Sequence, residues 1–356
     1  MSVGGSLTLA VAASVRQEIV SGKWPLQARL PTDQSLAREH CVGLNTVRRA
    51  LGLLVEEGLV ERRRGSGSIV VAIPGAARSD QPMVGLMVPS TRWYYPDLIA
   101  GVEQVVGQAG GHVLLRSTEQ QPAHELALLD DLVARQPTAL ILVPTIFGGL
   151  DPRKYLRRLE SLGLPLVLAE RVPAGGHGRD LSWVATDTRR GGEAAVRHLT
   201  SLGRRRIGLL SSRDTATSEE LYAGFSAAVA ESGARVDRAV LRQPEFSDEE
   251  LVAYAERVRR LRLDGLVCLD DMTANRLLGP LSRQGIRVPD DLAVIAYENS
   301  VTTRNGSELS TIEPPRFEVG RLAAQVVLRA LEVPDPAVVQ VSVAPRLVVR
   351  SSTGDP

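Results

Sequence analysis

Short, continuously apolar runs separated by longer amphipathic stretches are the feature that most constrains the fold after residue 82. Runs of this kind, without polar alternation, are typical of parallel strands that helices cover on both faces. About 270 residues exceed one comfortable α/β core, so two lobes are predicted. The candidate strands are Met83–Val88, His112–Leu115, Ala139–Val143, Leu166–Ala169, Ile207–Leu210, Gly265–Leu269 and Ala293–Tyr297.

The segment before residue 60 predicts three helices. A helix over residues 7–20 carries apolar groups at helical spacing, namely Leu7, Val11, Val15 and Ile19. Thr32 is a good N-cap for a second helix, which is predicted to run to about His40. A third helix is predicted over residues 44–57. The buried face of this third helix is predicted to consist of Val47, Ala50, Leu51 and Leu54.

A basic, glycine-turned hairpin follows these helices. Two short strands, Leu59–Glu61 and Ser68–Val71, are predicted on either side of Arg62–Gly67. A helix pair followed by such a wing is a winged helix-turn-helix, whose second helix enters a major groove while the wing lies along phosphates or the minor groove. An arginine cluster alone is equally well explained as a solvated face. The ordered combination of helix, turn, helix and wing indicates DNA binding.

Several motifs stand at fixed spacings within residues 7–72: Leu30-Pro31-Thr32-Asp33, Thr46-Val47-Arg48-Arg49-Ala50-Leu51, Leu53, Glu57-Gly58-Leu59-Val60 and Gly65-Ser66-Gly67-Ser68. With these motifs the segment resembles the GntR family. The resemblance implies binding of a double-stranded DNA operator by a homodimer. The candidate DNA-binding residues that it implies, together with the wing arginines, are Thr32, Gln34, Asn45, Thr46, Arg48, Arg49, Arg63, Arg64, Gly65 and Gly67.

The segment departs from the family pattern at the start of the reading helix. Cys41, Gly43 and Leu44 stand where the family usually has Gly, Ser and Arg, and Gln34 replaces a frequent Arg. Each missing Arg removes a candidate bidentate guanine contact, worth about 1–3 kcal/mol of discrimination. We therefore expect an operator that differs from the commonest sequence of the family.

Residues 73–82 combine Pro, Gly and polar groups without periodicity and are predicted to link a domain of residues 1–72 to one of residues 83–356. Beyond the linker, motifs follow one another in a fixed order: Met83-Val84-Gly85-Leu86-Met87-Val88-Pro89, Gly101-Val102-Glu103, Pro165-Leu166-Val167-Leu168-Ala169-Glu170-Arg171, Asp187-Thr188-Arg189-Arg190-Gly191-Gly192, Ala223-Gly224-Phe225, Val288-Pro289-Asp290-Asp291-Leu292, Tyr297-Glu298 and Pro345-Arg346-Leu347-Val348-Val349-Arg350. With them, residues 83–353 resemble the LacI family and its periplasmic-binding-protein-like effector domain. The resemblance implies two lobes of parallel sheets flanked by helices, with a ligand between them.

Open α/β sheets bind ligands beyond the carboxyl ends of their strands. Aromatic faces with a few charged hydrogen-bonding groups suit a sugar or another polar ring. The candidate effector-binding residues that follow strands are Trp93, Tyr94, Tyr95, Phe147, Glu170, Arg171, Asp187, Asp270 and Glu298. The LacI resemblance places Glu170, Asp270 and Glu298 at frequent ligand-contact positions.

Other roles are open for several of these residues. The three aromatic residues at 93–95 are also compatible with a dimer surface or a lobe interior. Asp270 or Asp271 could cap the next helix, Glu170 could pair with Arg171, and Asp187 could be a crossover turn residue. Leu221 stands where many sugar-responsive relatives place an Arg. That substitution predicts an unusually acidic pocket and a neutral or cationic effector, such as a sugar or an amino sugar.

Several classes of protein are disfavoured. Cys41 and Cys268 match no disulfide or metal-ligand spacing, so we expect neither a zinc site nor another cofactor. No apolar run reaches the roughly 18–20 residues of a membrane span, and a cytoplasmic protein is expected. Gly110-Gly111 ends a predicted helix rather than forming a nucleotide loop, and Gly65-Ser66-Gly67 lies in the wing rather than at a nucleophile elbow. We therefore expect no enzymatic activity.

These patterns predict a DNA-binding transcriptional regulator, most simply a repressor, controlled by a sugar-like effector between two lobes. Two alternatives remain open at this point. One is a small-molecule receptor whose N-terminal module no longer reads DNA specifically, for which Gln34 and Leu44 are the best support. The other is a sugar-processing enzyme with a regulatory head.

Overall fold

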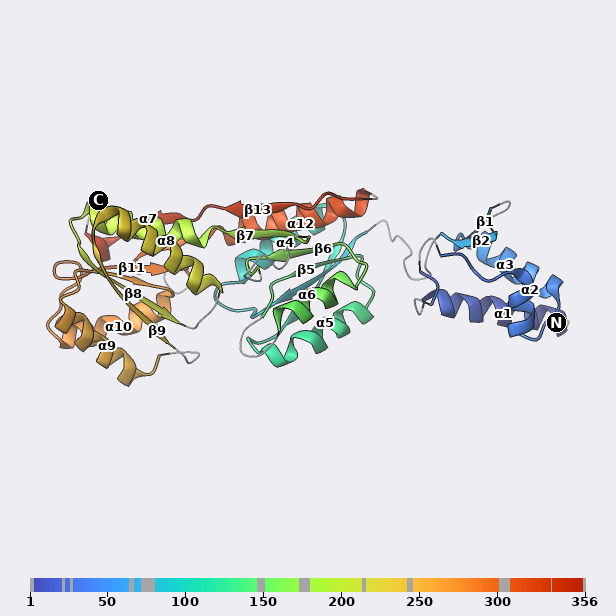
Figure 1. Cartoon of the computed structure of the whole chain (residues 1–356), viewed down its shortest axis with the longest axis horizontal. Helices are drawn as coiled ribbons and strands as arrows, with labels where there is room; N and C mark the ends of the chain where they lie inside the picture. Colours follow the sequence, from blue (N-terminus) through green and yellow to red (C-terminus); the bar gives the residue numbers. More distant parts are fainter. Residues whose placement is uncertain are drawn as a thin grey trace. The chain divides into compact units, whose positions relative to one another are not determined.

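The chain divides into two compact units, Met1–Asp80 and Gln81–Pro356 (Figure 1). The structure is a computed structural model and describes residues 3–20, 23–25, 28–63, 67–71, 81–145, 151–172, 180–212, 216–241, 246–300, 308–333 and 335–354. Most of the predicted linker at residues 73–82 lies outside these ranges. No helix within them is long and apolar enough to span a membrane.

The first unit is a winged helix-turn-helix. Its elements are α1 (Val3–Val20), α2 (Asp33–Glu39), α3 (Leu44–Glu56), β1 (Val60–Arg63) and β2 (Gly67–Val70), and the two strands pair antiparallel. The Thr32 hydroxyl accepts a hydrogen bond from Ser35 N and caps α2 as predicted. The predicted buried face of α3 is confirmed, and it packs with Val11, Val15 and Ile19 of α1. Leu7, which shares their spacing, is instead 46% exposed.

The first lobe of the second unit is a six-stranded parallel sheet covered on both faces. The order is β13-β7-β6-β5-β3-β4, with β3 (Met83–Val88), β4 (His112–Ser117), β5 (Ala139–Leu142), β6 (Leu166–Ala169), β7 (Ser182–Thr186) and β13 (Gln340–Val343). Helices α4 (Pro96–Gln108) and α12 (Arg316–Glu332) share one hydrophobic core with the sheet, and α5 (Glu125–Ala134) and α6 (Pro152–Glu160) share another. In Figure 1 the red α12 and β13 accordingly lie with the cyan and green elements of this lobe.

The second lobe repeats this arrangement. Its sheet order is β14-β12-β11-β10-β8-β9, and only β14 among these strands runs antiparallel to its neighbour. The strands are β8 (Arg206–Ser212), β9 (Arg235–Leu241), β10 (Gly265–Cys268), β11 (Ala293–Tyr297), β12 (Ser310–Glu313) and β14 (Arg346–Val348). Helices α7 (Thr188–Ser201) and α8 (Ala216–Ser232) share one core with this sheet, and α9 (Asp248–Leu261) and α10 (Asp271–Arg283) share the other.

The chain passes between the two lobes three times, from β7 to α7, from β12 to α12, and from β13 to β14. All seven predicted strands are confirmed, with ends that shift by one or two residues. The strands that prediction missed are β7, β9, β12, β13 and β14. Each of these strands contains at least one polar residue and lies at or next to a sheet edge.

Candidate effector site and DNA-reading surface

Two glutamates occupy equivalent places in the two lobes. Glu170 directly follows β6 and Glu298 directly follows β11, and each of these strands is the fourth of its sheet along the chain. The Glu170 amide donates to Val184 O at 2.9 Å, and the Glu298 amide donates to Ile312 O at 2.9 Å. Both residues have positive φ, 57° and 107°. Non-glycine residues are held in such conformations chiefly where the surrounding structure over-determines them, often at functional sites.

The Glu170 carboxylate is held by three hydrogen bonds from the first lobe. It accepts hydrogen bonds from Tyr94 Oη at 3.0 Å, from Thr186 N at 3.1 Å and from Thr186 Oγ1 at 3.0 Å. Burial raises the pKa of Glu170, although these donors act in the opposite direction. Glu170 is therefore a positioned acid whose protein contacts fix its orientation.

The Glu298 carboxylate differs from that of Glu170 in its hydrogen bonding. Among the residues that the structure describes, none gives it a hydrogen bond or an ion pair. Burial, reinforced by the nearby Asp270 and Asp271, raises the pKa of Glu298 well above its usual range. A partly buried acid with open acceptor positions is suited to receive donors from a small molecule.

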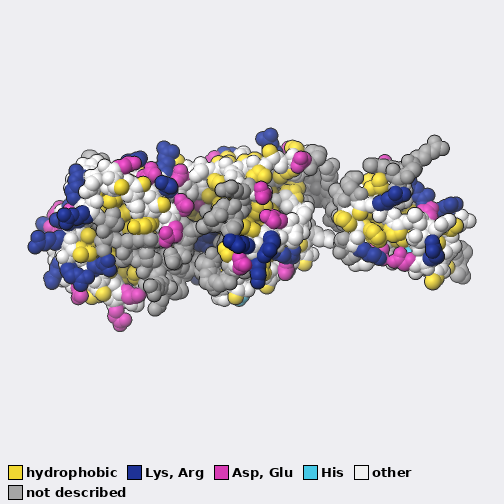
Figure 2. Space-filling view, viewed as in Figure 1, with side chains coloured by type: hydrophobic (Ala, Val, Ile, Leu, Met, Phe, Trp, Pro, Cys, Tyr) yellow, Lys and Arg dark blue, Asp and Glu magenta, His cyan; other side chains and the backbone are white. Residues whose placement is uncertain are grey.

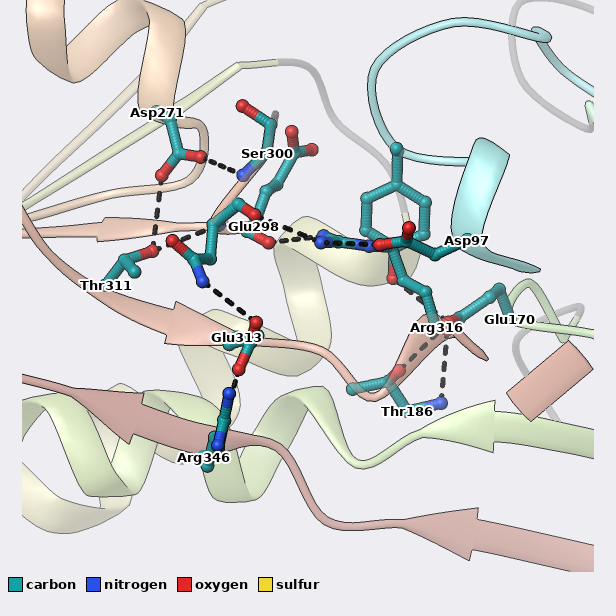
Figure 3. A network of polar contacts seen from close by, with 12 residues as sticks. Asp97, Glu170, Thr186, Asp271, Glu298, Ser300, Thr311, Glu313, Arg316 and Arg346 are labelled. Carbon is teal, nitrogen blue, oxygen red and sulfur yellow. Dashed lines mark hydrogen bonds and ion pairs between the residues drawn. The ribbon is translucent and has the colours of Figure 1, made fainter. Parts of the chain in front are cut away.

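A network of polar contacts holds the turn after β11 in place (Figure 3). Asn299 N donates to Thr311 Oγ1 at 3.2 Å, and Asn299 Nδ2 donates to Glu313 at 2.8 Å. Ser300 N donates to the buried carboxylate of Asp271 at 2.6 Å, and that carboxylate also accepts from Thr311 Oγ1. The turn that presents Glu298 is therefore fixed from both β12 and α10.

Arg316, at the start of α12, is a site residue that prediction missed. Its side chain is only 1% exposed. It donates to Glu298 O and to Asn299 O (3.1 Å), approaches Asp97 Oδ2 at 3.4 Å, and lies 4.9 Å from the centre of the Tyr94 ring. Arg316 follows two prolines rather than an apolar run. Its position therefore lacks the sequence signal that marks the residues after the predicted strands.

Two cations lie close to the acids of the candidate site. Leu221 is fully buried in the hydrophobic core that α7 and α8 share with the sheet. Arg316 and Arg171 instead stand among the acids, and both act to lower the raised pKa of Glu298. The unusually acidic pocket that Leu221 predicts stays a prediction.

The predicted aromatic group separates into three environments. Trp93 is 49% exposed and has a φ of 61°. Tyr94 lies between Glu170 and Arg316. Tyr95 is buried in the first-lobe core, where burial raises its pKa to about 12, and its ring centre lies 6.0 Å from the Arg171 guanidinium. The interior alternative therefore holds for Tyr95, while Phe147 lies outside the described residues.

Two of the predicted acids act as helix N-caps, which was an open alternative for Asp270 and was not predicted for Asp187. Asp270 caps α10 by accepting from Thr273 N at 2.5 Å and from Thr273 Oγ1 at 2.8 Å. Asp187 caps α7 by accepting from Arg190 N at 2.9 Å. Arg171 does not need Glu170 for its orientation, because it donates to Pro144 O at 3.4 Å. Effector contact by these residues stays a prediction.

In the first unit, the predicted reading face of α3 points away from the core. Asn45, Arg48 and Arg49 are exposed and Thr46 is partly buried, while Thr32 and Gln34 of the preceding helix are exposed. Asp33 pairs with Arg48 at 3.4 Å and with Arg62 at 3.6 Å, so one carboxylate joins α2, α3 and β1. Gly67 has a φ of 84°. Arg64, Gly65 and the side chain of Arg63 lie outside the described residues.

Charge of one sign does not dominate the face of the first unit seen in Figure 2. In the space-filling view, basic and acidic side chains are interspersed on the visible face of the first unit (Figure 2). The first unit contains ion pairs such as Arg16 with Glu57 (2.6 Å) and Lys23 with Glu18 (2.6 Å). The order of the structural elements is therefore a better guide to DNA binding than net charge.

Two family models match the chain. Residues 7–70 match bacterial regulatory proteins of the gntR family, and residues 180–353 match the periplasmic binding protein-like domain. An HTH-type transcriptional regulator from the aml 5′ region of Streptomyces limosus is 30% identical over 288 residues, covering 78% of this chain and 80% of that protein. The chain belongs to the HTH-type transcriptional regulators.

Other relatives agree with this assignment. The regulator is 27% identical to the arabinose metabolism transcriptional repressor of Geobacillus stearothermophilus, over 97% of this chain and 98% of that protein. The transcription regulator GntR of Chromobacterium violaceum has a TM-score of 0.65 at 25% identity, over 76% of this chain and 99% of that chain. The complex of the regulator CelR with cellobiose shares the fold, with a TM-score of 0.66 at 20% identity, over 91% of this chain and 100% of that chain. These proteins regulate transcription, and the regulator described here is likewise not an enzyme.

Proposed function

We propose that this regulator is a dimeric repressor whose affinity for operator DNA is lowered by a neutral sugar bound between its two lobes. The observation that carries the proposal is the Glu298 carboxylate, which has no described donor and stands on a strained turn beside Arg316. Sugar hydroxyls are the donors that such a carboxylate lacks. A repressor of this kind acts in the cytoplasm, where its operator is.

The relatives support a sugar rather than another polar ring. Two arabinose metabolism repressors match 97% of the chain. Solved regulators that share the fold are described with ribose, cellobiose and D-xylulofuranose. Because the arabinose repressors extend over both units, they also favour a working DNA module over a receptor that no longer reads DNA.

The proposed effector contacts lie at the strand ends of both lobes. From the first lobe they comprise Trp93, Tyr94, Glu170 and Arg171, together with the sequence-predicted Phe147. From the second lobe they comprise Asp187, Asp270 and Glu298. The buried Arg316 joins this set because it contacts Tyr94 and the Glu298 carbonyl.

The proposed DNA contacts lie on α2, α3 and the wing, in a reading domain of residues 1–72. Gln34, Asn45, Arg48 and Arg49 are exposed and available to base edges and phosphates. Residues 83–356 then bind the effector and form the homodimer. Half-sites lie about one helical turn apart or a multiple of it, so a small change in dimer geometry weakens binding. The sugar must bind the form with low DNA affinity more tightly, with a coupling of about 1–3 kcal/mol.

The test is an operator-binding assay with the DNA upstream of the regulator's own gene, at two salt concentrations and with random duplex as competitor. Arabinose, ribose, cellobiose and xylulose are then added one at a time. We expect specific binding that weakens steeply with salt, because phosphate contacts release counterions, and release by one of these sugars. Absence of any sequence preference at both salt concentrations would contradict the proposal.

A further inference from the structure

We propose that Arg316 is a positioning residue that connects the turn carrying Glu298 to the first lobe. Glu298 is then held in its position in the effector site only while Arg316 contacts both lobes. The proposal deepens the proposed function and rests on it for its biological meaning. The contacts from which it is argued belong to the chain itself.

The turn after β11 requires support because two successive non-glycine residues adopt positive φ there, 107° at Glu298 and 48° at Asn299. The second lobe supplies part of that support through the side chains of Thr311, Glu313 and Asp271, which hold Asn299 and Ser300. The carbonyl oxygens of Glu298 and Asn299 accept from the Arg316 guanidinium instead. Arg316 therefore holds the residue that bears the open carboxylate.

Arg316 itself is anchored to the first lobe. Its helix, α12, packs closely on α4: a Cβ on Gly101 would lie 2.1 Å from Phe317 O, and a Cβ on Gly320 would lie 2.1 Å from Leu98 O. Helices that touch at backbone level leave little room to slide. The Arg316 side chain thus extends from a fixed base in the first lobe to a turn of the second.

Two groups of the first lobe orient the guanidinium. Asp97, in the first turn of α4, pairs with Arg316 at 3.4 Å, and the Tyr94 ring lies 4.9 Å away. Tyr94 Oη in turn donates to Glu170. Arg316 therefore stands between the two equivalent glutamates, and Figure 3 shows it among the side chains of both lobes.

The chemistry of this junction requires an arginine. A guanidinium presents five N–H donors in a rigid fork and can serve two carbonyls and a carboxylate at once, whereas a lysine ammonium is a point charge on a flexible stem. A buried cation is tolerated only where such partners surround it. If the lobes separate, Arg316 and the turn lose contact with each other, and the Glu298 turn loses the support that its strained backbone needs.

The experiment measures amide hydrogen exchange in the full-length protein without any sugar, so it is independent of whether the proposed effector binds. Asp97→Asn removes the charge that orients Arg316 from the first lobe. We expect the amides of residues 298–300 to exchange about tenfold faster, while those of Gly265–Cys268 in the same lobe keep their rates. The matched control is Glu103→Gln, which removes an exposed carboxylate from the same helix and leaves residues 298–300 unchanged.

A second variant separates positioning from general destabilisation. Arg316→Lys keeps a positive charge but loses the fork, so it also accelerates exchange at residues 298–300. If Asp97 acts through Arg316, then adding Asp97→Asn to Arg316→Lys gives no further acceleration at the turn. Equal exchange at the turn in Asp97→Asn and Glu103→Gln would overturn the proposal, as would additive effects in the double variant. A failed sugar titration alone would count against the proposed function and not against this contact.

Discussion

The two lobes have the same strand order and place a glutamate with positive φ at the same position, yet the two glutamates differ in the hydrogen bonds that they accept. Glu170 accepts three hydrogen bonds from its own lobe, whereas the described residues leave the Glu298 carboxylate without a donor. A repeated fold therefore repeats positions, and the neighbouring side chains decide what each position does. The comparison predicts that one glutamate mainly supports structure and that the other mainly binds ligand.

The largest expected effect tests the ligand-binding half of this comparison. Glu298→Gln should weaken the affinity for the sugar that releases the operator about 10–100-fold, because the amide nitrogen of Gln cannot accept a hydrogen bond and a buried hydroxyl left without its acceptor costs roughly 1–3 kcal/mol. Isothermal titration calorimetry measures this loss. The matched control is Asp290→Asn, which changes an exposed acid away from the strand ends. Unchanged affinity in Glu298→Gln would remove Glu298 from the site.

The next effect tests the structural half. Glu170→Ala strands Tyr94 Oη and both Thr186 donors, so we expect a loss of about 2–3 kcal/mol in the free energy of unfolding. Denaturant unfolding measures it, and Glu298→Ala serves as the equivalent truncation in the other lobe. Equal losses from the two truncations would mean that the two glutamates are not distinguished by their contacts.

A smaller effect is expected from removing the Tyr94 hydroxyl. Tyr94→Phe removes the hydroxyl that donates to Glu170 but keeps the ring beside Arg316. The expected cost is about 1 kcal/mol of stability, the net value of one hydrogen bond. Sugar affinity should fall less than in Glu298→Gln, as calorimetry can show. A loss of affinity equal to that of Glu298→Gln would place the Tyr94 hydroxyl in direct contact with the sugar.

The smallest expected effect concerns pH. Burial raises the pKa of Glu298, so the folded state favours the protonated acid, and its ionisation costs stability as pH rises above the ordinary carboxyl range. Glu298→Gln avoids that cost. We expect its melting temperature to match that of the parent protein near pH 4 and to exceed it at pH 8. A difference that is constant with pH would contradict the assignment.

Much of the fold was predictable because its central strands are continuously apolar. Runs such as Met83–Val88 and Ala293–Tyr297 end where the sequence indicates. The edge strand β4 was predicted as well. The strands that were missed, such as β9 and β12, mix polar with apolar residues. Their existence follows only from pairing with neighbours that are distant in sequence.

The candidate site was predictable where it follows such strands and not elsewhere. Glu170 and Glu298 were found because they directly follow apolar runs. Whether Asp187 and Asp270 cap helices could not be decided from sequence, since a capping acid and a ligand-binding acid can occupy the same position. Arg316 had no local signal, because its partners Asp97 and Glu298 come from different lobes.

The packing of α12 in the first lobe has a consequence for synthesis on the ribosome. One of the two hydrophobic cores of the first lobe is built from β3, β5, β6, α4 and α12, and α12 supplies Val319, Ala323, Ala324 and Val327 to it. Nearly the whole second lobe is translated between α6 and α12. Until α12 is synthesised, α4 alone supplies helical cover to that face of the first-lobe sheet. Neither lobe acquires its last strand until β13 and β14 are translated, and these two strands follow each other closely in the sequence.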